Sequence, residues 1–185
     1  MLEELSSTFP ILTCILFLPL VGAAVLWLVD DEDMVKTSAL TIALLELALS
    51  VFILLRFIPD SAAMQFSEHV PWIPALGISY HLAVDGISVL FVGRTAFLTV
   101  LIVIYSWDTV RHQIKVYMMA LLALETTTMG VFLSIDLILF FVFWEVMLLP
   151  MYFLIGIWGG PRREYAAIKF FLYTMLGSVL MLLVM

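Results

Sequence analysis

The chain has 185 residues, of which 64% are hydrophobic, and its mean hydropathy is +1.18. A soluble domain is closer to half apolar, so this composition excludes a soluble globular domain and predicts an integral membrane protein. The formal net charge of −7 is opposite in sign to the basic footprint of a nucleic-acid-binding protein, which excludes a nucleic-acid partner. The single cysteine, Cys14, cannot supply a disulfide framework or a metal site.

Six apolar segments are predicted to cross the lipid bilayer as α-helices. Runs of about 20 apolar residues span about 30 Å of hydrocarbon, and these runs lack the period-two alternation of barrel strands. The sequence therefore predicts an all-α, polytopic transmembrane helix bundle that forms a single membrane domain over residues 1–185. The segments are Phe9–Val29, Met34–Phe57, Val84–Ser106, Val116–Leu133, Leu137–Trp158 and Tyr165–Met185.

The segment 58–83, between the second and third predicted helices, is rich in proline and contains Gly77. Such composition is typical of turns and loops, so we expect an irregular external loop. Asp85 directly follows this loop and is expected to cap the third helix, since aspartate is a preferred N-cap residue. The sixth segment ends at Met185 without a polar anchor, and we therefore expect the chain to be the N-terminal part of a longer protein.

Basic residues predict the orientation of the chain in the membrane. Five of them fall on one side of the predicted bundle, and only Arg56 lies at a helix end on the other side. Because positively charged loops stay in the cytoplasm, the N-terminus is expected outside the cytoplasm. The five residues on the cytoplasmic side are Lys36, Arg111, Lys115, Arg162 and Arg163.

Glu145 is the most informative residue for predicting the function of this chain. It lies in the middle of the apolar run Leu137–Trp158, in which no basic residue balances its charge. A charged residue near the bilayer centre costs about 2.5–3.5 kcal/mol on insertion scales, and such residues usually mark ion or proton pathways. The sequence therefore predicts that Glu145 takes part in proton transfer.

Three more ionisable residues are predicted at a similar depth: Glu46, Arg94 and Glu125. At about 1.5 Å per residue, each lies about 15 Å below the outer surface, as Glu145 does. Two interpretations stay open. Arg94 neutralises Glu46 or Glu125 and holds the helices together, or the charged residues form a secondary path for protons across the membrane.

Lys169 lies closer to the cytoplasmic end of the sixth predicted helix. Its long side chain could reach the membrane surface. Alternatively, it is buried among protein, because Tyr165, Lys169, Tyr173 and Gly177 are spaced four residues apart and share one helix face. An aromatic face that includes a small residue favours packing against another helix.

The sequence contains no glycine fingerprint for a nucleotide, no nucleophile elbow and no iron–sulfur ligand set. The three histidines are too scattered to predict a metal site. We therefore expect no redox centre, cofactor or metal in this chain.

Two neighbouring stretches together resemble a known protein family: Asp136–Gly160, which includes Glu145 and Pro150, and Tyr165–Thr174. Val70–Pro74 and Gly77–Ser88 form a second match. The family comprises the antiporter-like subunits of proton-pumping NADH:quinone oxidoreductase (respiratory complex I), and the similarity is to chain M (subunit 4). The resemblance implies an antiporter-like fold of about fourteen helices, of which this chain supplies about six.

The resemblance also implies a function and partners. Glu145 matches the family's fifth-helix glutamate, which works with a lysine on a broken seventh helix, and Lys169 matches the sixth-helix lysine. Glu46 and Arg94 match no family position. The implied role is a proton-translocating subunit of the translocase. NADH, FMN, iron–sulfur clusters and quinone are expected in partner subunits, and other membrane subunits, including antiporter-like ones, are expected as neighbours in a bacterial inner (plasma) membrane.

Two other functions fit the same residues. The fold also occurs in Mrp-type monovalent cation/proton antiporters, so the chain could belong to a transporter without redox partners. A passive membrane scaffold or a non-functional truncated fragment is the third interpretation.

Overall fold

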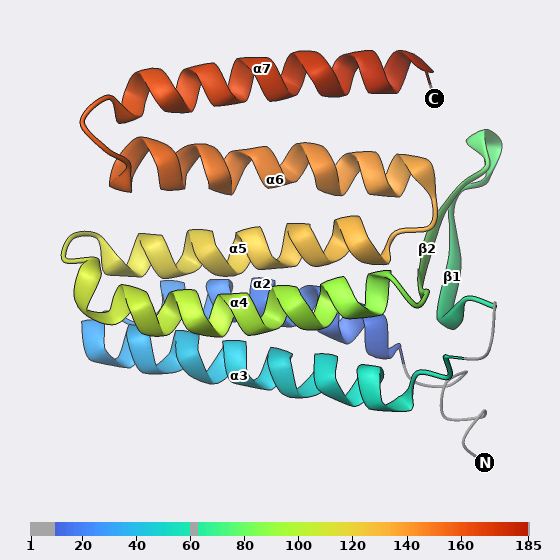
Figure 1. The fold of residues 1–185 in the computed structure, drawn as a ribbon, viewed down its shortest axis with the longest axis horizontal. Coiled ribbons are helices and arrows are strands. Elements are labelled where there is room, and N and C mark those ends of the chain that lie inside the picture. Colours follow the sequence, from blue (N-terminus) through green and yellow to red (C-terminus); the bar gives the residue numbers. More distant parts are fainter. Residues whose placement is uncertain (1–9, 60–62, 185) are drawn as a thin grey trace.

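The computed structural model describes residues 10–59 and 63–184. Within these residues all six predicted segments are α-helices that run side by side and alternate in direction (Figure 1). Phe9 and Met185, the outermost ends of the predicted helices, lie outside the described residues. The helices are α2 (Ile11–Trp27), α3 (Glu32–Arg56), α4 (Ser88–Thr109), α5 (Ile114–Leu133), α6 (Leu137–Trp158) and α7 (Arg163–Val184).

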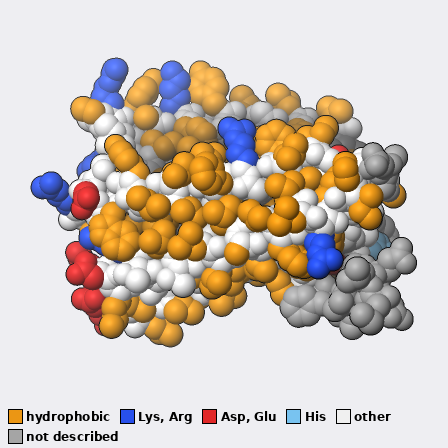
Figure 2. Space-filling view, turned by 60° about the horizontal axis from the view of Figure 1, so that its bottom comes forward, with side chains coloured by type: hydrophobic (Ala, Val, Ile, Leu, Met, Phe, Trp, Pro, Cys, Tyr) orange, Lys and Arg blue, Asp and Glu red, His pale blue; other side chains and the backbone are white. Residues whose placement is uncertain are grey.

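Five of these helices, α3 to α7, are long and apolar enough to cross a membrane. The remaining helix, α2, is equally apolar but has 17 residues, which corresponds to a length of about 25 Å. Hydrophobic side chains cover most of the visible outside of the bundle, and most of the visible Asp and Glu lie at one end, while single Lys or Arg side chains also stand elsewhere on this face (Figure 2). An apolar exterior is typical of a surface that faces lipid, so the predicted membrane helix bundle is confirmed.

Aspartates set the first turn of three helices. Asp31 accepts a hydrogen bond from the backbone N–H of Met34 (2.9 Å) at the start of α3. Asp85 accepts from Ser88 N (2.6 Å), and Ser88 Oγ in turn accepts from Asp85 N (2.9 Å). This reciprocal pair confirms that Asp85 caps the helix. The helix α4 begins at Ser88, whereas the sequence predicted a start at Val84. Asp136 caps α6 by accepting hydrogen bonds from the backbone N–H groups of Ile138 (2.9 Å) and Leu139 (3.2 Å).

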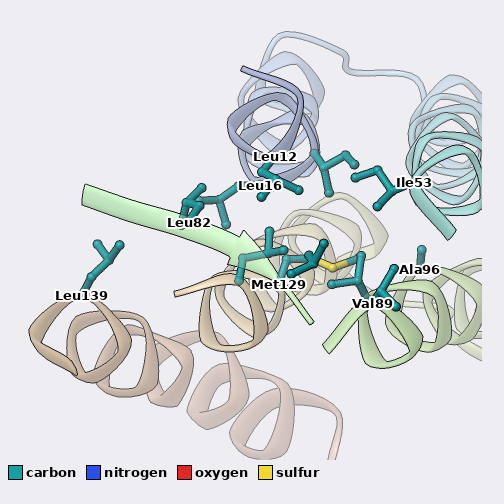
Figure 3. Packing of buried hydrophobic residues seen from close by; sticks show 12 residues of the cluster. Leu12, Leu16, Ile53, Leu82, Val89, Ala96, Met129 and Leu139 are labelled. Atoms are coloured by element: carbon teal, nitrogen blue, oxygen red, sulfur yellow. The ribbon is translucent and has the colours of Figure 1, made fainter. Parts of the chain in front are cut away.

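Buried apolar side chains form two clusters along the bundle. Figure 3 shows the first cluster, in which Leu12 of α2, Ile53 of α3 and Met129 of α5 converge with Leu82. The most apolar stretch of α5 is 50% buried, whereas that of α7 is 11% buried. The chain therefore surrounds α5 with its own helices and leaves most of α7 uncovered.

The expected irregular loop is instead a β-hairpin. Strand β1 (Gln65–Ile73) pairs antiparallel with β2 (Ile78–Val84), and the short 3-10 helix η1 (Pro74–Leu76) joins them. The turn ends at Gly77, whose φ of 68° suits glycine. Proline is tolerated in this sheet because both strands are edge strands, which explains why the proline-based prediction of an irregular segment was wrong.

The hairpin is hydrogen-bonded to the helices at this end of the bundle. Glu68 of β1 accepts hydrogen bonds from the N–H groups of Leu12 (2.7 Å) and Thr13 (3.1 Å) in the first turn of α2. Asp136 accepts from Ser79 N (2.9 Å), in addition to capping α6. The hairpin therefore fixes the starts of two helices that are far apart in the sequence.

Candidate functional site

Glu145 lies in α6, eight positions after the first helical residue, Leu137. At 1.5 Å per residue this is about 12 Å into the membrane-spanning part of the helix. Its side chain is half-buried, and its Oε1 atom is buried without a hydrogen-bond partner among the described residues. A buried oxygen without a partner is costly, so this carboxyl group is available to a proton, to water or to a group from another chain.

The packing of α6 on α7 shows which way Glu145 faces. The rings of Tyr152 and Phe171 meet at 5.8 Å between centroids, and a Cβ added at Gly156 would lie 3.7 Å from the Cβ of Ala167. In an antiparallel pair of helices, the same register brings Glu145 level with Ser178. Glu145 is also on the Tyr152 face of α6, since it is seven residues, about two turns, away.

Ser178 is 3% exposed, and its hydroxyl donates to the backbone carbonyl of Met175 (3.0 Å). Ser178 is not among the site residues predicted from the sequence. Its signal is weak, because a serine in a membrane helix is common and only the register between α6 and α7 brings it level with Glu145.

Lys169 is not brought together with Glu145. Its ammonium group lies 5.7 Å from the ring centroids of both Tyr165 and Tyr173, which confirms that these residues share one helix face. That face is exposed, and it lies opposite the Ala167 face that packs on α6. Packing of this face against another helix therefore remains a prediction.

Glu46 of α3 and Glu125 of α5 are 0% and 2% exposed. Their carboxyl groups lie close enough for their charges to interact, yet all four of their oxygens lack a hydrogen-bond partner among the described residues. The hydroxyl of Thr99 on α4 lies beside Glu125, but it donates to the carbonyl of Thr95 (3.1 Å). The structure therefore brings the two acids together between three helices.

Arg94 is not the counter-ion of these acids. Its side chain is exposed, and it makes no ion pair with any carboxylate in the described part of the chain. It also lies only six positions after the start of α4 at Ser88, about 9 Å into the helix. Spacing along the chain predicts a depth but no direction around the helix, and the predicted depth is too large because α4 starts at Ser88 and not at Val84.

Pro150 lies inside α6, five residues after Glu145, and the helix continues through it to Trp158. Proline has no N–H to donate, so the carbonyl of Val146 loses its usual helical partner. A polar backbone group is thereby left one residue from Glu145.

No group of three or more His, Cys, Asp or Glu side chains that could hold a metal ion occurs among residues 10–59 and 63–184. The donors that a metal or cluster would need are not assembled in this part of the structure. Glu46, Glu125 and Glu145 also form no ion pair with a basic side chain among these residues.

Comparison with known proteins agrees with this architecture. Residues 134–185 match the family model described as "NADH:quinone oxidoreductase/Mrp antiporter, TM". The chain is 47% identical over 181 residues to NADH-quinone oxidoreductase subunit M of Rhodobacter capsulatus, and it is 41% identical over 181 residues to subunit M of Rickettsia conorii. The predicted family resemblance is confirmed.

The alignments cover 95% and 94% of this chain but only 35% and 37% of those relatives. The chain therefore spans about a third of the length of the curated relatives it matches. Among solved structures, it resembles a chain of respiratory complex I from Thermus thermophilus with bound NADH, with a TM-score of 0.78 and 27% identity, over 92% of this chain and 34% of that one.

The Mrp complex from a Dietzia species is similar in fold, with a TM-score of 0.76 and 24% identity, over 91% of this chain and 18% of that one. The antiporter-like fold is thus shared between the two kinds of assembly.

Proposed function

We propose that this chain is part of a proton-translocating membrane subunit of an NADH:quinone oxidoreductase. Its relatives at 47% and 41% identity carry the name NADH-quinone oxidoreductase subunit M. The observation that supports proton translocation is Glu145, whose buried oxygen has no partner among the described residues. In this proposal the chain holds no redox centre, and NADH, FMN, iron–sulfur clusters and quinone belong to partner subunits.

Glu145 releases a proton as a positive charge approaches and accepts one as that charge leaves. A charge pair at 4 Å interacts by about 4 kcal/mol at an effective dielectric constant of about 20. Moving one elementary charge against about 100 mV requires about 2.3 kcal/mol. The two energies are comparable in size, so one approaching ammonium group supplies a substantial part of the energy needed to move a proton against the membrane potential.

Lys169 faces away from Glu145 within this chain, so it does not supply that ammonium group in the described arrangement. We propose that Lys169 transfers protons on the opposite face of α7, where another helix of the subunit or a neighbouring antiporter-like subunit covers it. A lysine inside a membrane-spanning helix needs such a protein or water environment.

The Mrp-type cation/proton antiporter is the second candidate function. The description of the matched family model, which names the Mrp antiporter beside the NADH:quinone oxidoreductase, supports it. We favour the oxidoreductase because the curated relatives at 47% and 41% identity are both named NADH-quinone oxidoreductase subunit M. A passive scaffold is disfavoured because it gives no reason to retain buried acids without counter-ions.

Purification of the natural full-length subunit under mild detergent tests the assignment. With an affinity tag on this subunit, we expect flavin and iron–sulfur subunits to co-purify, together with NADH:quinone activity. The control is the same tag on an unrelated membrane protein of the same cell. Co-purification with other antiporter-like subunits alone, without NADH oxidation, would instead identify an Mrp-type antiporter.

A further inference from the structure

The acids Glu46 and Glu125 are separate from Glu145. Glu46 lies on the buried stripe of α3 that also includes Ala43, Ser50 and Ile53. Glu125 lies on α5, beside Thr99 of α4. Glu145, by contrast, lies on the face of α6 that packs on α7. The bundle thus contains a second polar location, enclosed by helices of this chain alone.

Ser50 belongs to this second location. It follows Glu46 by four residues, which is about one helical turn on the same face. It is 0% exposed, and its hydroxyl has no hydrogen-bond partner in the described structure. Five buried oxygens, four from carboxyl groups and one from a hydroxyl group, are therefore left unsatisfied between α3, α4 and α5.

No basic group neutralises the two acids. Neither acid forms an ion pair with a lysine, arginine or histidine among the described residues. The ionisable groups on the same and neighbouring helices lie elsewhere. Those of α3 lie at the helix ends, and Arg94, Tyr105 and Asp108 of α4 are exposed. On α5, Lys115 pairs with Asp30, and the hydroxyl of Tyr117 accepts a hydrogen bond from Ser106. Glu145 and Tyr152 of α6 face α7, and Cys14 of α2 is half-buried.

A buried carboxylate without a counter-charge is strongly disfavoured, whereas a protonated carboxyl group is neutral and can donate a hydrogen bond. A metal cation would need several oxygen ligands at fixed distances. No cluster of three or more acidic, His or Cys ligands is present in the described residues. Two acids and a hydroxyl group therefore fit a proton better than a metal ion.

We propose that Glu46 and Glu125, with the hydroxyl of Ser50, form a proton-binding site in the α3–α5 half of the bundle. Loading the site forms an O–H bond at a carboxylate oxygen and removes a proton from water. Unloading breaks that bond and returns the proton to water, so the step needs no other reactant. The site holds protons independently of Glu145 and of the redox partner of the assembly.

Infrared difference spectroscopy on the full-length subunit in its native assembly tests this site directly. A protonated carboxylic acid has a C=O stretching band that shifts in deuterated water. At neutral pH, we expect Glu46→Gln and Glu125→Gln each to remove one such band, and we expect Ser50→Ala to shift the band of Glu46. Glu32→Gln is the matched control, since Glu32 is an exposed acid on the same helix.

The amount of assembled complex is measured for each variant. If Glu46→Gln or Glu125→Gln fails to assemble, Glu46→Asp and Glu125→Asp keep an acid at each position and should show the band at a shifted frequency. Unchanged spectra in both glutamine variants, or bands that appear only when sodium and potassium are removed, would overturn the proposal. Because this result does not depend on pumping or NADH oxidation, it is independent of the proposed function.

Discussion

At the scale of single residues, the acidic side chains are of two kinds: those that cap helices and those inside the membrane-spanning helices. Asp85 and Asp136 lie outside the membrane helices and are satisfied by backbone N–H groups. At Asp85, hydrogen bonds from Ser88 hold the pKa below its usual value. Burial opposes ionisation of Asp136, but hydrogen bonds from Ser79, Leu139 and Ile138 outweigh it and lower its pKa. The oxygens of Glu46 and Glu125 and the Oε1 atom of Glu145 have no such donor among the described residues, and this difference separates structural aspartates from candidate proton carriers.

Asp136 gives a prediction at this scale. Asp136→Ala removes the cap of α6 and its bond to the hairpin, and a lost cap costs about 1 kcal/mol. We expect lower thermal stability in detergent, while Asp108→Ala, which changes an exposed acid, serves as the control.

The pH dependence follows from the lowered pKa of Asp136. Its contribution to stability is complete above the unfolded value of about 3.9 and is lost as the pH falls through the lower folded value. The stability difference between parent and Asp136→Ala should therefore shrink only below about pH 4. An equal difference at pH 3 and pH 7 would contradict this assignment.

At the scale of elements, α7 is the least covered helix. Tyr165 and Tyr173 are 64% and 69% exposed, and they flank Lys169 on the uncovered face. No described residue lies within 4 Å of a Cβ added at Gly177, which is also exposed. A charged residue inside a span is tolerated where it faces protein or water, so this face is expected to be an interface.

Substitution of Lys169 tests that expectation. If protein covers this face and pairs with the lysine, Lys169→Leu should reduce the yield of assembled complex, and Lys169→Arg should retain it. If the lysine faces lipid, leucine removes a cost of about 2.5–3.5 kcal/mol and should assemble at least as well as the parent. That second outcome, measured by native gel electrophoresis, would contradict the predicted interface.

At the scale of the whole molecule, the loops α2–α3, α4–α5 and α6–α7 lie at one end of the bundle, and the hairpin lies at the other (Figure 1). Lys115 of α5 pairs with Asp30 at 3.1 Å at the loop end. The excess of lysine and arginine at that end predicts that it is cytoplasmic.

Single cysteines test this orientation in a Cys14→Ser background. We expect a membrane-impermeant thiol reagent to label Gly160→Cys only from the cytoplasmic side and Leu76→Cys, at the hairpin turn, only from outside. The opposite labelling pattern would reverse the predicted direction of proton access.

The helices could be predicted from the sequence because each is a long apolar run, and the acids could be assigned a depth by counting. The hairpin could not be predicted, because a proline-rich segment is typical of a loop and only the strand pairing distinguishes it. Arg94 could not be placed either, since depth does not determine the direction of a side chain around its helix. The pairing of Glu46 with Glu125 likewise depends on how α3 packs on α5.

The central claim is that Glu145 carries protons, and the ratio of protons pumped to electrons transferred tests it most directly. In proteoliposomes that contain the full assembly, Glu145→Gln should retain electron transfer but lower this ratio, because glutamine keeps the shape and cannot be ionised. Glu145→Asp should retain part of the ratio, and the exposed control Glu164→Gln should leave it unchanged. A normal ratio in Glu145→Gln would contradict the account.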